Sequence, residues 1–267
     1  MKSMKHPFVR TGALALCAVL LAFGCGCRKQ TAAPPAEEIA GYTPVLAETD
    51  TPELQKLQDA IAANPDTVAW LVVPGTEINE AVVQAEDNEY YLRRNALGQP
   101  ENWGCTFSDH LNVLTSRKAL HTNSILYGHS HNSEDPTLPQ FTQLFRFLNE
   151  DFLTENPGFS LFLPDGDRLD FQIAAVLYAD TSFDYINPFP DESYYSELSA
   201  RNEYAFENVS ITPEDKLVTL STCAYRFDVN NTHNHRFVVV GKLLPEGHTA
   251  EAAAFTKEEQ PKRPEAE

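Results

Sequence analysis

Two residues at the ends of neighbouring apolar segments carry the side chains of a nucleophilic site. Cys223 follows the mainly apolar residues 217–220, and Arg236 directly precedes the apolar residues 237–240. If both segments are neighbouring strands, the thiol and the guanidinium lie at the same end of one sheet. A thiolate is a nucleophile, and a guanidinium keeps the positive charge that stabilises a developing oxyanion. A cysteine that only packs and an arginine that only meets solvent are the alternatives at these positions.

A base for this thiol has one favoured candidate. His129 follows the apolar residues 124–127 through Gly128, so we expect it at the end of a third strand. An imidazole beside a thiol takes up its proton and activates it. Other histidines compete for this role, and Arg226 competes with Arg236. The competing histidines are His131, His121, His233 and His235.

The histidines also allow a different hypothesis, a zinc site. His129 with His131, and His233 with His235, form two His-x-His pairs, each beside a proposed strand. Imidazole is a common zinc ligand, but no carboxylate or cysteine spacing of a zinc motif accompanies these pairs. We therefore favour thiol chemistry and expect neither a metal nor a cofactor.

The order of the candidate residues excludes two classes of cysteine peptidase. His129 precedes Cys223 by 94 residues, whereas in papain-like enzymes the cysteine comes first. The Gln-Ala-Cys signature of caspases is absent as well.

The charge of the chain argues against a nucleic-acid partner. The formal net charge of the 267 residues is −18. Residues 1–30 hold five of the 20 Lys and Arg and no acidic residue, so the remainder has 15 basic against 38 acidic residues. Binding to phosphates needs a basic surface, which this composition does not provide.

The cysteines indicate a protein with free thiols or a single disulfide. Cys17, Cys25 and Cys27 lie in the N-terminal apolar segment, which leaves Cys105 and Cys223 in the body. In an exported protein these two could pair. Two thiols, one of them reactive, fit the sequence equally well.

The N-terminus has the composition of an export signal. Residues 1–30 combine a positively charged start with an apolar run over residues 12–27. Residues 21–25 resemble a degenerate lipobox, which would place a lipid on Cys25; an uncleaved signal anchor is the alternative. Both predict a cell-membrane protein whose body lies on the extracellular face. Residues 31–50 are rich in Pro, Ala and Glu and predict a disordered linker.

The body, residues 51–244, is predicted to be mostly β. Thr51 and Pro52 have the types that begin a helix, and apolar spacing continues it to residue 63. A helical turn is predicted at residues 87–91, and further helical segments are predicted at residues 141–148 and, within a long insertion, at 192–206. A closed eight-stranded barrel is the economical arrangement because it leaves no sheet edge. The tail, residues 245–267, is acidic and is expected to fray. The predicted strands cover residues 68–73, 78–84, 103–108, 124–127, 159–163, 169–178, 217–220 and 237–240.

With these residues in place, the sequence resembles the bacterial sortases of class B from about residue 64 to residue 244. The segment TLSTC at residues 219–223 is similar to the cysteine signature of sortases, and RFVVV at 236–240 to their arginine-bearing last strand. YGH at 127–129 is similar to the histidine motif. NPDTVAWL at 64–71 and PGT at 74–76 are similar to the first strand of class B.

The resemblance implies a sortase-like barrel with an N-terminal helix and a helix-containing insertion before the cysteine strand. It implies a transpeptidase that cleaves a sorting signal of secreted proteins between Thr and Gly or Asn. Cys223 would form the thioacyl intermediate, His129 would transfer protons, and Arg236 would stabilise the oxyanion. An amine of the peptidoglycan precursor or crossbridge would accept the acyl group. The resemblance also assigns residues to the substrate groove: Thr181, Tyr185, Ile186, Ser221 and, more weakly, Leu97.

Several features depart from the class, among them a second histidine at residue 131 and the possible lipobox. The interval from Cys223 to Arg236 covers 13 positions and holds two histidines, and Cys105 stands where a small residue such as serine is expected. Two other functions remain as alternatives: a non-catalytic, membrane-tethered binding lipoprotein, and a hydrolytic cysteine peptidase on the same barrel.

Overall fold

The computed structural model describes residues 51–230 and 233–266, which belong to one compact unit. The predicted export signal, residues 1–30, and the predicted linker, residues 31–50, lie outside the described residues. Within the described ranges, no helix is long and apolar enough to cross a membrane.

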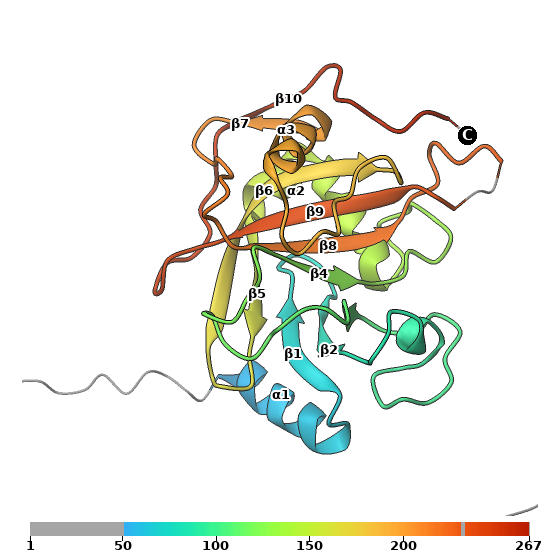
Figure 1. Cartoon of the computed structure of the whole chain (residues 1–267), viewed down its shortest axis with the longest axis vertical. Helices are drawn as coiled ribbons and strands as arrows, with labels where there is room; N and C mark the ends of the chain where they lie inside the picture. The colour runs from blue at the N-terminus through green and yellow to red at the C-terminus, as the bar shows by residue number, and fades with distance from the viewer. Residues whose placement is uncertain (1–50, 231–232, 267) are drawn as a thin grey trace, which may run out of the picture. The chain divides into compact units, whose positions relative to one another are not determined.

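Eight strands form a closed barrel (Figure 1), which confirms the mostly β fold predicted from the sequence. Around the barrel their order is β1, β2, β3, β4, β8, β9, β6 and β5. The pairs β2–β3 and β4–β8 are parallel, and the other pairs are antiparallel. The strands are β1 (Thr67–Val72), β2 (Asn79–Val83), β3 (Phe107–Ser108), β4 (Asn123–Tyr127), β5 (Gly158–Phe162), β6 (Arg168–Ala179), β8 (Leu217–Cys223) and β9 (Arg236–Leu243).

Apolar side chains fill the barrel and cover part of its outside. Leu71, Leu126 and Val239 are fully buried in the largest cluster, which lies between the strands. A second cluster joins Leu177 of β6 to Leu198 of helix α3 (Glu192–Arg201). Alternate residues of the strands therefore face these two apolar environments, which holds α3 against the outside of the sheet.

Helix α1 (Pro52–Ala63) begins and ends where the sequence predicts. Thr51 accepts a hydrogen bond from the Leu54 amide, and Pro52 stands in the first turn, where no amide hydrogen is needed. Leu54 and Leu57 are buried with Phe162 of β5. The helix is therefore fixed to the barrel just before β1 begins.

Some predicted elements differ from the structure in type or extent. The segment predicted as a helix at 141–148 is a 3-10 helix, η2 (Gln140–Leu148), followed by the short helix α2 (Glu150–Glu155). In the insertion, α3 ends at Arg201 because the Asn202 side chain leaves the helix and bonds to the β6 backbone at Val176 and Ala174. The short strand β7 (Tyr204–Phe206) follows. A second 3-10 helix, η1 (Tyr90–Arg93), forms where a helical turn is predicted at 87–91.

The pairing of three strands brings the ends of the predicted catalytic segments together. In the parallel pair β4–β8, Tyr127 lies opposite Ser221, and the Gly128 amide donates to the Ser221 carbonyl at 3.2 Å. In the antiparallel pair β8–β9, Cys223 lies opposite Arg236. The residue after Gly128, the last residue of β8 and the first residue of β9 therefore share one end of the barrel.

The prediction that residues 245–267 fray is wrong for the described part of the tail. Strand β10 (Phe255–Lys257) pairs with β7, and Arg263 forms a two-pronged ion pair with Glu203, whose Nε–Oε1 distance is 2.9 Å. The side chain of Glu203 is 1% exposed. An acidic composition suggested a solvated tail, but these contacts depend on a partner strand and a buried carboxylate about 50 to 60 residues upstream.

We expect Arg263→Met to destabilise the protein by about 2 kcal/mol, because it leaves the buried Glu203 carboxylate without its partner. Urea unfolding of a soluble form that begins at residue 46 measures this change. Lys262→Met is the matched control, because its partner Glu197 is on the surface, and it should cost less than about 1 kcal/mol. Equal losses for both variants would show that the tail does not depend on the Glu203 pair.

Candidate active site

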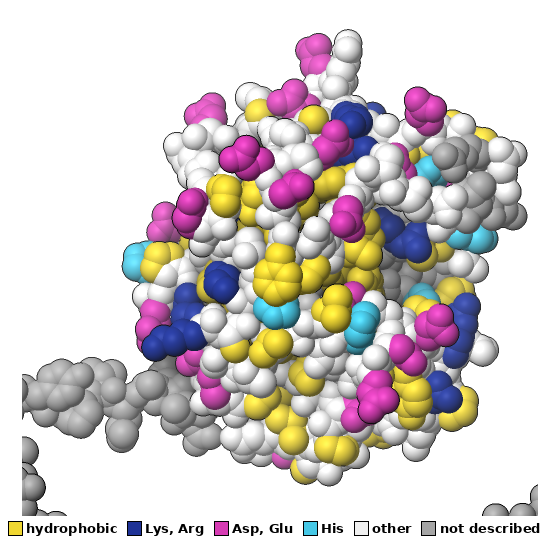
Figure 2. Space-filling model, viewed as in Figure 1, with side chains coloured by type: hydrophobic (Ala, Val, Ile, Leu, Met, Phe, Trp, Pro, Cys, Tyr) yellow, Lys and Arg dark blue, Asp and Glu magenta, His cyan; other side chains and the backbone are white. Residues whose placement is uncertain are grey.

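Cys223, His129 and Arg236 line the same cavity, which has a volume of about 320 Å³. In Figure 2 the surface is hollowed near the ends of β4 and β8, with hydrophobic side chains in the hollow. Three of the five residues predicted to bind the substrate also line this cavity: Tyr185, Ile186 and Ser221. The structure thus brings together residues that are up to 107 positions apart in the sequence.

The strand register sets the relation between the thiol and the guanidinium. Directly opposite residues of an antiparallel pair have Cβ atoms about 5 Å apart and side chains on the same face. Cys223 and Arg236 are such a pair. Ser221, two residues before Cys223, shares that face and lies 2.9 Å, Oγ to hydroxyl oxygen, from Tyr185. The intervening Thr222 also lines the cavity, and its hydroxyl donates to the Gly128 carbonyl at 2.7 Å.

The imidazole of His129 is oriented by a backbone carbonyl. Its Nε2 lies 2.9 Å from the carbonyl oxygen of Leu92 in η1. Because a carbonyl only accepts, Nε2 carries a hydrogen and Nδ1 holds the lone pair of the neutral ring. Burial lowers the pKa of His129, and Arg93 and His131 act in the same direction, while the hydrogen bond to Leu92 opposes them. The ring is therefore mainly neutral at pH 7 and able to accept the thiol proton.

The guanidinium of Arg236 is held on one side only. One terminal nitrogen donates to the carbonyls of His233, at 2.7 Å, and His235, at 2.9 Å. Among the described residues, its other two nitrogens have no hydrogen-bond partner. His233 adopts a positive φ of 55° and donates its amide to Asp228 at 3.0 Å. The backbone carbonyls between β8 and β9 thus orient the Arg236 guanidinium. Its remaining nitrogens can donate hydrogen bonds to a ligand.

Neither Arg226 nor any rival histidine lines this cavity. Arg226 does not line the cavity; it is paired with Glu134, Nε to Oε2 at 3.9 Å, and is half exposed. His131 stacks on Trp103 with ring centroids 4.4 Å apart, and His235 is buried beside Phe227. In the described part of the chain, no three His, Cys, Asp or Glu side chains are grouped to hold a metal ion.

Two of the residues predicted to bind substrate lie elsewhere. Leu97 is 56% exposed in the turn around Gly98, and Thr181 is exposed at the start of the insertion; neither lines the cavity. Asn88 and Leu92 line it instead, and no sequence motif pointed to them. The only sequence signal near these two residues was the helical turn predicted at 87–91.

A carboxylate that the sequence analysis missed connects the histidine and cysteine segments. Glu134 Oε1 accepts hydrogen bonds from the amides of Tyr225, at 2.8 Å, and Arg226, at 2.7 Å. Its Oε2 accepts from the Tyr178 hydroxyl at 3.0 Å. Glu134 therefore fixes the backbone that directly follows Cys223 to the loop that directly follows His129.

Cys105 has the properties of a structural thiol. Burial raises its pKa to about 12, with Glu80 acting in the same direction. It packs beside the cluster of Val83, Tyr91 and Phe107 and does not line the cavity. Cys105 and Cys223 are both free thiols, so the structure contains no disulfide between them.

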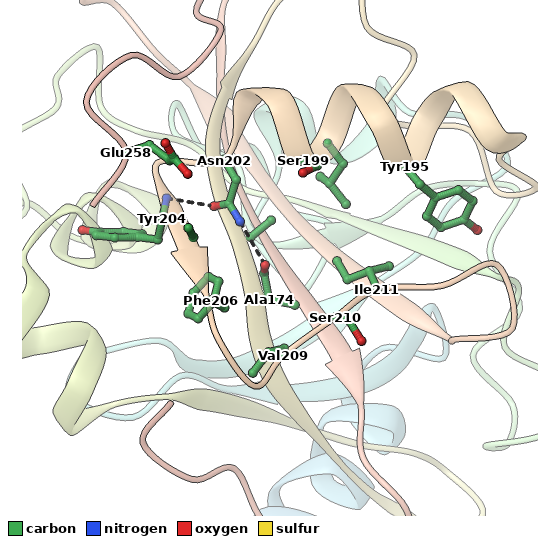
Figure 3. A pocket seen from close by; sticks show the side chains of 13 residues that line it. Ala174, Tyr195, Ser199, Asn202, Tyr204, Phe206, Val209, Ser210, Ile211 and Glu258 are labelled. Carbon is green, nitrogen blue, oxygen red and sulfur yellow. Dashed lines mark hydrogen bonds between the residues drawn. The ribbon is translucent and has the colours of Figure 1, made fainter. Parts of the chain in front are cut away.

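A cavity of about 340 Å³ lies between α3, β6 and β7 (Figure 3). Asn202 bridges its wall by accepting from the Tyr204 amide at 3.3 Å and donating to the Ala174 carbonyl at 3.1 Å. Among the described residues, it shares no lining residue with the cavity at Cys223, and its lining contains no cysteine, histidine or arginine. None of the side chains predicted for catalysis therefore lines this cavity.

Comparison with known proteins gives one consistent family. No protein-family model matches the chain. Sortase B of Listeria monocytogenes is 33% identical over 194 residues, covering 71% of this chain and 74% of the relative. Sortase B of Staphylococcus aureus is 29% identical over 185 residues, covering 68% and 71%.

Solved structures agree with these relatives. A complex of Staphylococcus aureus sortase B with its substrate has a TM-score of 0.61 and 25% identity, covering 72% of this chain and 86% of that chain. Sortase B from Listeria monocytogenes has a TM-score of 0.58 and 32% identity, covering 70% and 99%.

We expect iodoacetamide at pH 8 to alkylate Cys223 and to leave Cys105 unmodified in the folded protein. With a pKa of about 12, only about one Cys105 thiol in 10,000 is ionised at that pH, and the thiolate is the reactive form. Peptide mass spectrometry of the form that begins at residue 46 measures both sites. The Cys223→Ala variant should take up label only after unfolding in urea; equal labelling of both cysteines in the native protein would contradict the assignment.

Proposed function

The chain belongs to the sortase B family of cysteine transpeptidases, and on this basis we propose that it cleaves a C-terminal sorting signal of secreted proteins and transfers the acyl product to a peptidoglycan amine. The observation that carries the proposal is the convergence of Cys223, His129 and Arg236 on one cavity. A nucleophile, a proton acceptor and an oxyanion donor are the groups that acyl transfer needs.

In the first half of the proposed reaction, Cys223 Sγ attacks the carbonyl carbon of the scissile peptide bond as His129 takes up the thiol proton. The carbonyl oxygen becomes an oxyanion, which the free donors of Arg236 stabilise. The carbon–nitrogen bond then breaks, and His129 gives the proton to the leaving amine. A thioester on Cys223 and a new amino terminus result.

In the second half, an incoming amine attacks the thioester carbon. The carbon–sulfur bond breaks, and His129 accepts the proton that the amine nitrogen loses and passes it to Cys223 Sγ. The products are a new amide and the free Cys223 thiol. Because the pKa of His129 is lowered, the ring is neutral and ready to accept a proton at the start of each half.

We propose that the scissile bond lies between Thr and Gly or Asn, as the resemblance implies. Support for a peptide site comes from the cavity walls, where Tyr185, Ile186 and Leu92 offer apolar surface and Ser221 and Asn88 offer polar groups. The relative from Staphylococcus aureus has been solved as a substrate complex. Thr181 and Leu97 remain predictions from the resemblance and stand outside this cavity.

We expect Cys223→Ala to abolish cleavage of fluorogenic peptides with a Thr–Gly or Thr–Asn bond. His129→Ala and Arg236→Ala should each lower kcat/KM by about 100-fold or more, because each removes proton transfer or oxyanion stabilisation. The controls are His131→Ala and Arg226→Ala, which alter the same loops without touching the cavity and should retain most activity. Cleavage by the Cys223→Ala protein would contradict the proposal.

Analysis of the reaction products in the same assay distinguishes a transpeptidase from a hydrolytic peptidase and from a non-catalytic binding protein. With an added amine, a transpeptidase yields the amide, and a hydrolytic cysteine peptidase yields only the acid. If mass spectrometry finds no thioester on reduced Cys223 with any peptide of a panel that varies the sorting motif, the non-catalytic binding protein is favoured instead.

We also propose that residues 1–30 tether the protein to the extracellular face of the cell membrane, on the basis of their charge and apolar run. The full chain should fractionate with membranes and be accessible to protease outside the cell, and a form that begins at residue 46 should be soluble. Cys25→Ala should release the protein if Cys25 carries a lipid and leave it bound if the segment is an anchor. Recovery of the full chain in the cytoplasmic fraction would refute the proposed location.

A further inference from the structure

Part of the wall of the cavity at Cys223 comes from an irregular segment of the chain. Tyr185 and Ile186 line this cavity and belong to the turns between β6 and α3. Tyr185 is buried against Ser221, whereas Ile186 is 41% exposed. Backbone groups of an irregular segment have no regular hydrogen-bond pattern of their own and need partners elsewhere. The shape of the cavity therefore depends on what holds residues 185–188, which we call the insertion wall.

Asn123, the first residue of β4, bonds to the backbone on both sides of Ile186. Its Nδ2 donates to the carbonyls of Tyr185, at 2.9 Å, and Asn187, at 3.1 Å. Its backbone amide donates to the Pro188 carbonyl at 3.2 Å. Asn123 is 0% exposed, so a carbonyl that lost this donor would have no partner in a largely buried place, which is unfavourable. These three bonds hold the insertion wall to the start of β4.

A residue of the cysteine strand sets the orientation of the Asn123 amide. Thr219 donates its hydroxyl to Asn123 Oδ1 at 2.7 Å and is itself fully buried. Because backbone carbonyls only accept, the amide nitrogen must face Tyr185 and Asn187, and Thr219 supplies the donor that the amide oxygen needs. Thr219 is the first residue of the segment TLSTC that ends at Cys223. Strand β8 therefore fixes the thiol and, through Asn123, the insertion wall as well.

The part of the insertion that precedes the insertion wall is held by a different residue. The buried Arg201 of α3 donates to Ser182 Oγ at 3.0 Å and is paired with Asp180, Nη1 to Oδ2 at 3.5 Å. These contacts do not involve Asn123. Loss of the Asn123 contacts should therefore release residues 185–188 and leave the rest of the insertion against α3.

Building on the proposed function, we propose that Asn123 is a positioning residue of the substrate site, which holds Tyr185 and Ile186 in place before the sorting peptide binds. Asn123 does not line the cavity and acts on the peptide only through the insertion wall. A wall that is already ordered spares the peptide the entropic cost of ordering it on binding. Release of the wall therefore weakens peptide binding and leaves the chemistry at Cys223 unchanged.

Steady-state cleavage of a fluorogenic peptide with a Thr–Gly or Thr–Asn bond, by the form that begins at residue 46, tests this assignment. We expect Asn123→Ala to raise KM about tenfold, as for the loss of one or two hydrogen bonds, and to change kcat less than about threefold. The isosteric Thr219→Val removes only the donor to Asn123 Oδ1 and should raise KM about threefold. Because Thr219 acts through Asn123, the double variant should have the KM of Asn123→Ala.

Two further measurements separate positioning from general damage. A variant that is only less stable has less folded enzyme, which lowers the apparent kcat and leaves KM unchanged. Alkylation of Cys223 by iodoacetamide does not need the insertion wall, so its rate should change less than about twofold in Asn123→Ala. Asn112→Ala is the matched control, because Asn112 is also buried and its Nδ2 donates to Ile125 of the same strand at 2.7 Å, yet it does not line the cavity. It should lower the free energy of unfolding in urea and keep the KM of the unaltered protein.

The outcomes distinguish this inference from the function on which it rests. An unchanged KM in Asn123→Ala, or in Thr219→Val should Asn123→Ala fail to fold, would overturn the positioning role and leave the transpeptidase intact. An equal increase of KM in Asn112→Ala would do the same. Failure of the unaltered protein to cleave any peptide of the panel would overturn the proposed function and the positioning role together.

Discussion

The parallel pairing of β4 with β8 is the constraint on which the active site depends. It is one of only two parallel pairs in the described barrel, and it places the carboxyl ends of two strands at the same edge. The residues that follow β4 therefore reach the last residue of β8. A shift of one residue in this register would turn Cys223 from the cavity face to the opposite face, because successive side chains of a strand alternate.

The antiparallel partner of β8 adds the third group under the same constraint. Arg236 is the first residue of β9 and lies directly opposite Cys223, the last residue of β8. Both side chains are therefore carried by barrel strands. Their surroundings then set the finer geometry through backbone groups. The Leu92 carbonyl orients His129, and the carbonyls of His233 and His235 orient Arg236. Carbonyls accept and never donate, so they fix which atoms of these side chains remain available.

A second cavity, of about 480 Å³, meets the first one at the end of β8. Among the described residues, only His129 and Cys223 line both cavities. Glu134 makes this division stable, since it joins the loops after His129 and after Cys223 through backbone amides.

The sequence by itself determined those features that are encoded locally. Thr51 and Pro52 specify the start of α1, and the alternating and apolar runs specify the strands that close the barrel. Cys223 and His129 could be chosen because each follows such a run, and the motifs around them point to one family. The interval before Arg236 left a rival, Arg226, although the apolar residues 237–240 favoured Arg236. The structure places Arg236 opposite Cys223 and pairs Arg226 with Glu134.

Tertiary structure alone decided the features that depend on contacts between distant segments. Leu92 meets His129 across 37 positions, and Glu134 meets the Tyr225 amide across 91. No local pattern signals either contact, since a carbonyl belongs to every residue and a loop glutamate is usually solvated. The tail likewise shows an acidic composition, yet it is held by Glu203, a carboxylate whose burial becomes apparent only when the insertion folds against the barrel. The physical reason is the same in each case: the free energy that stabilises each contact comes from groups that the chain brings together only on folding.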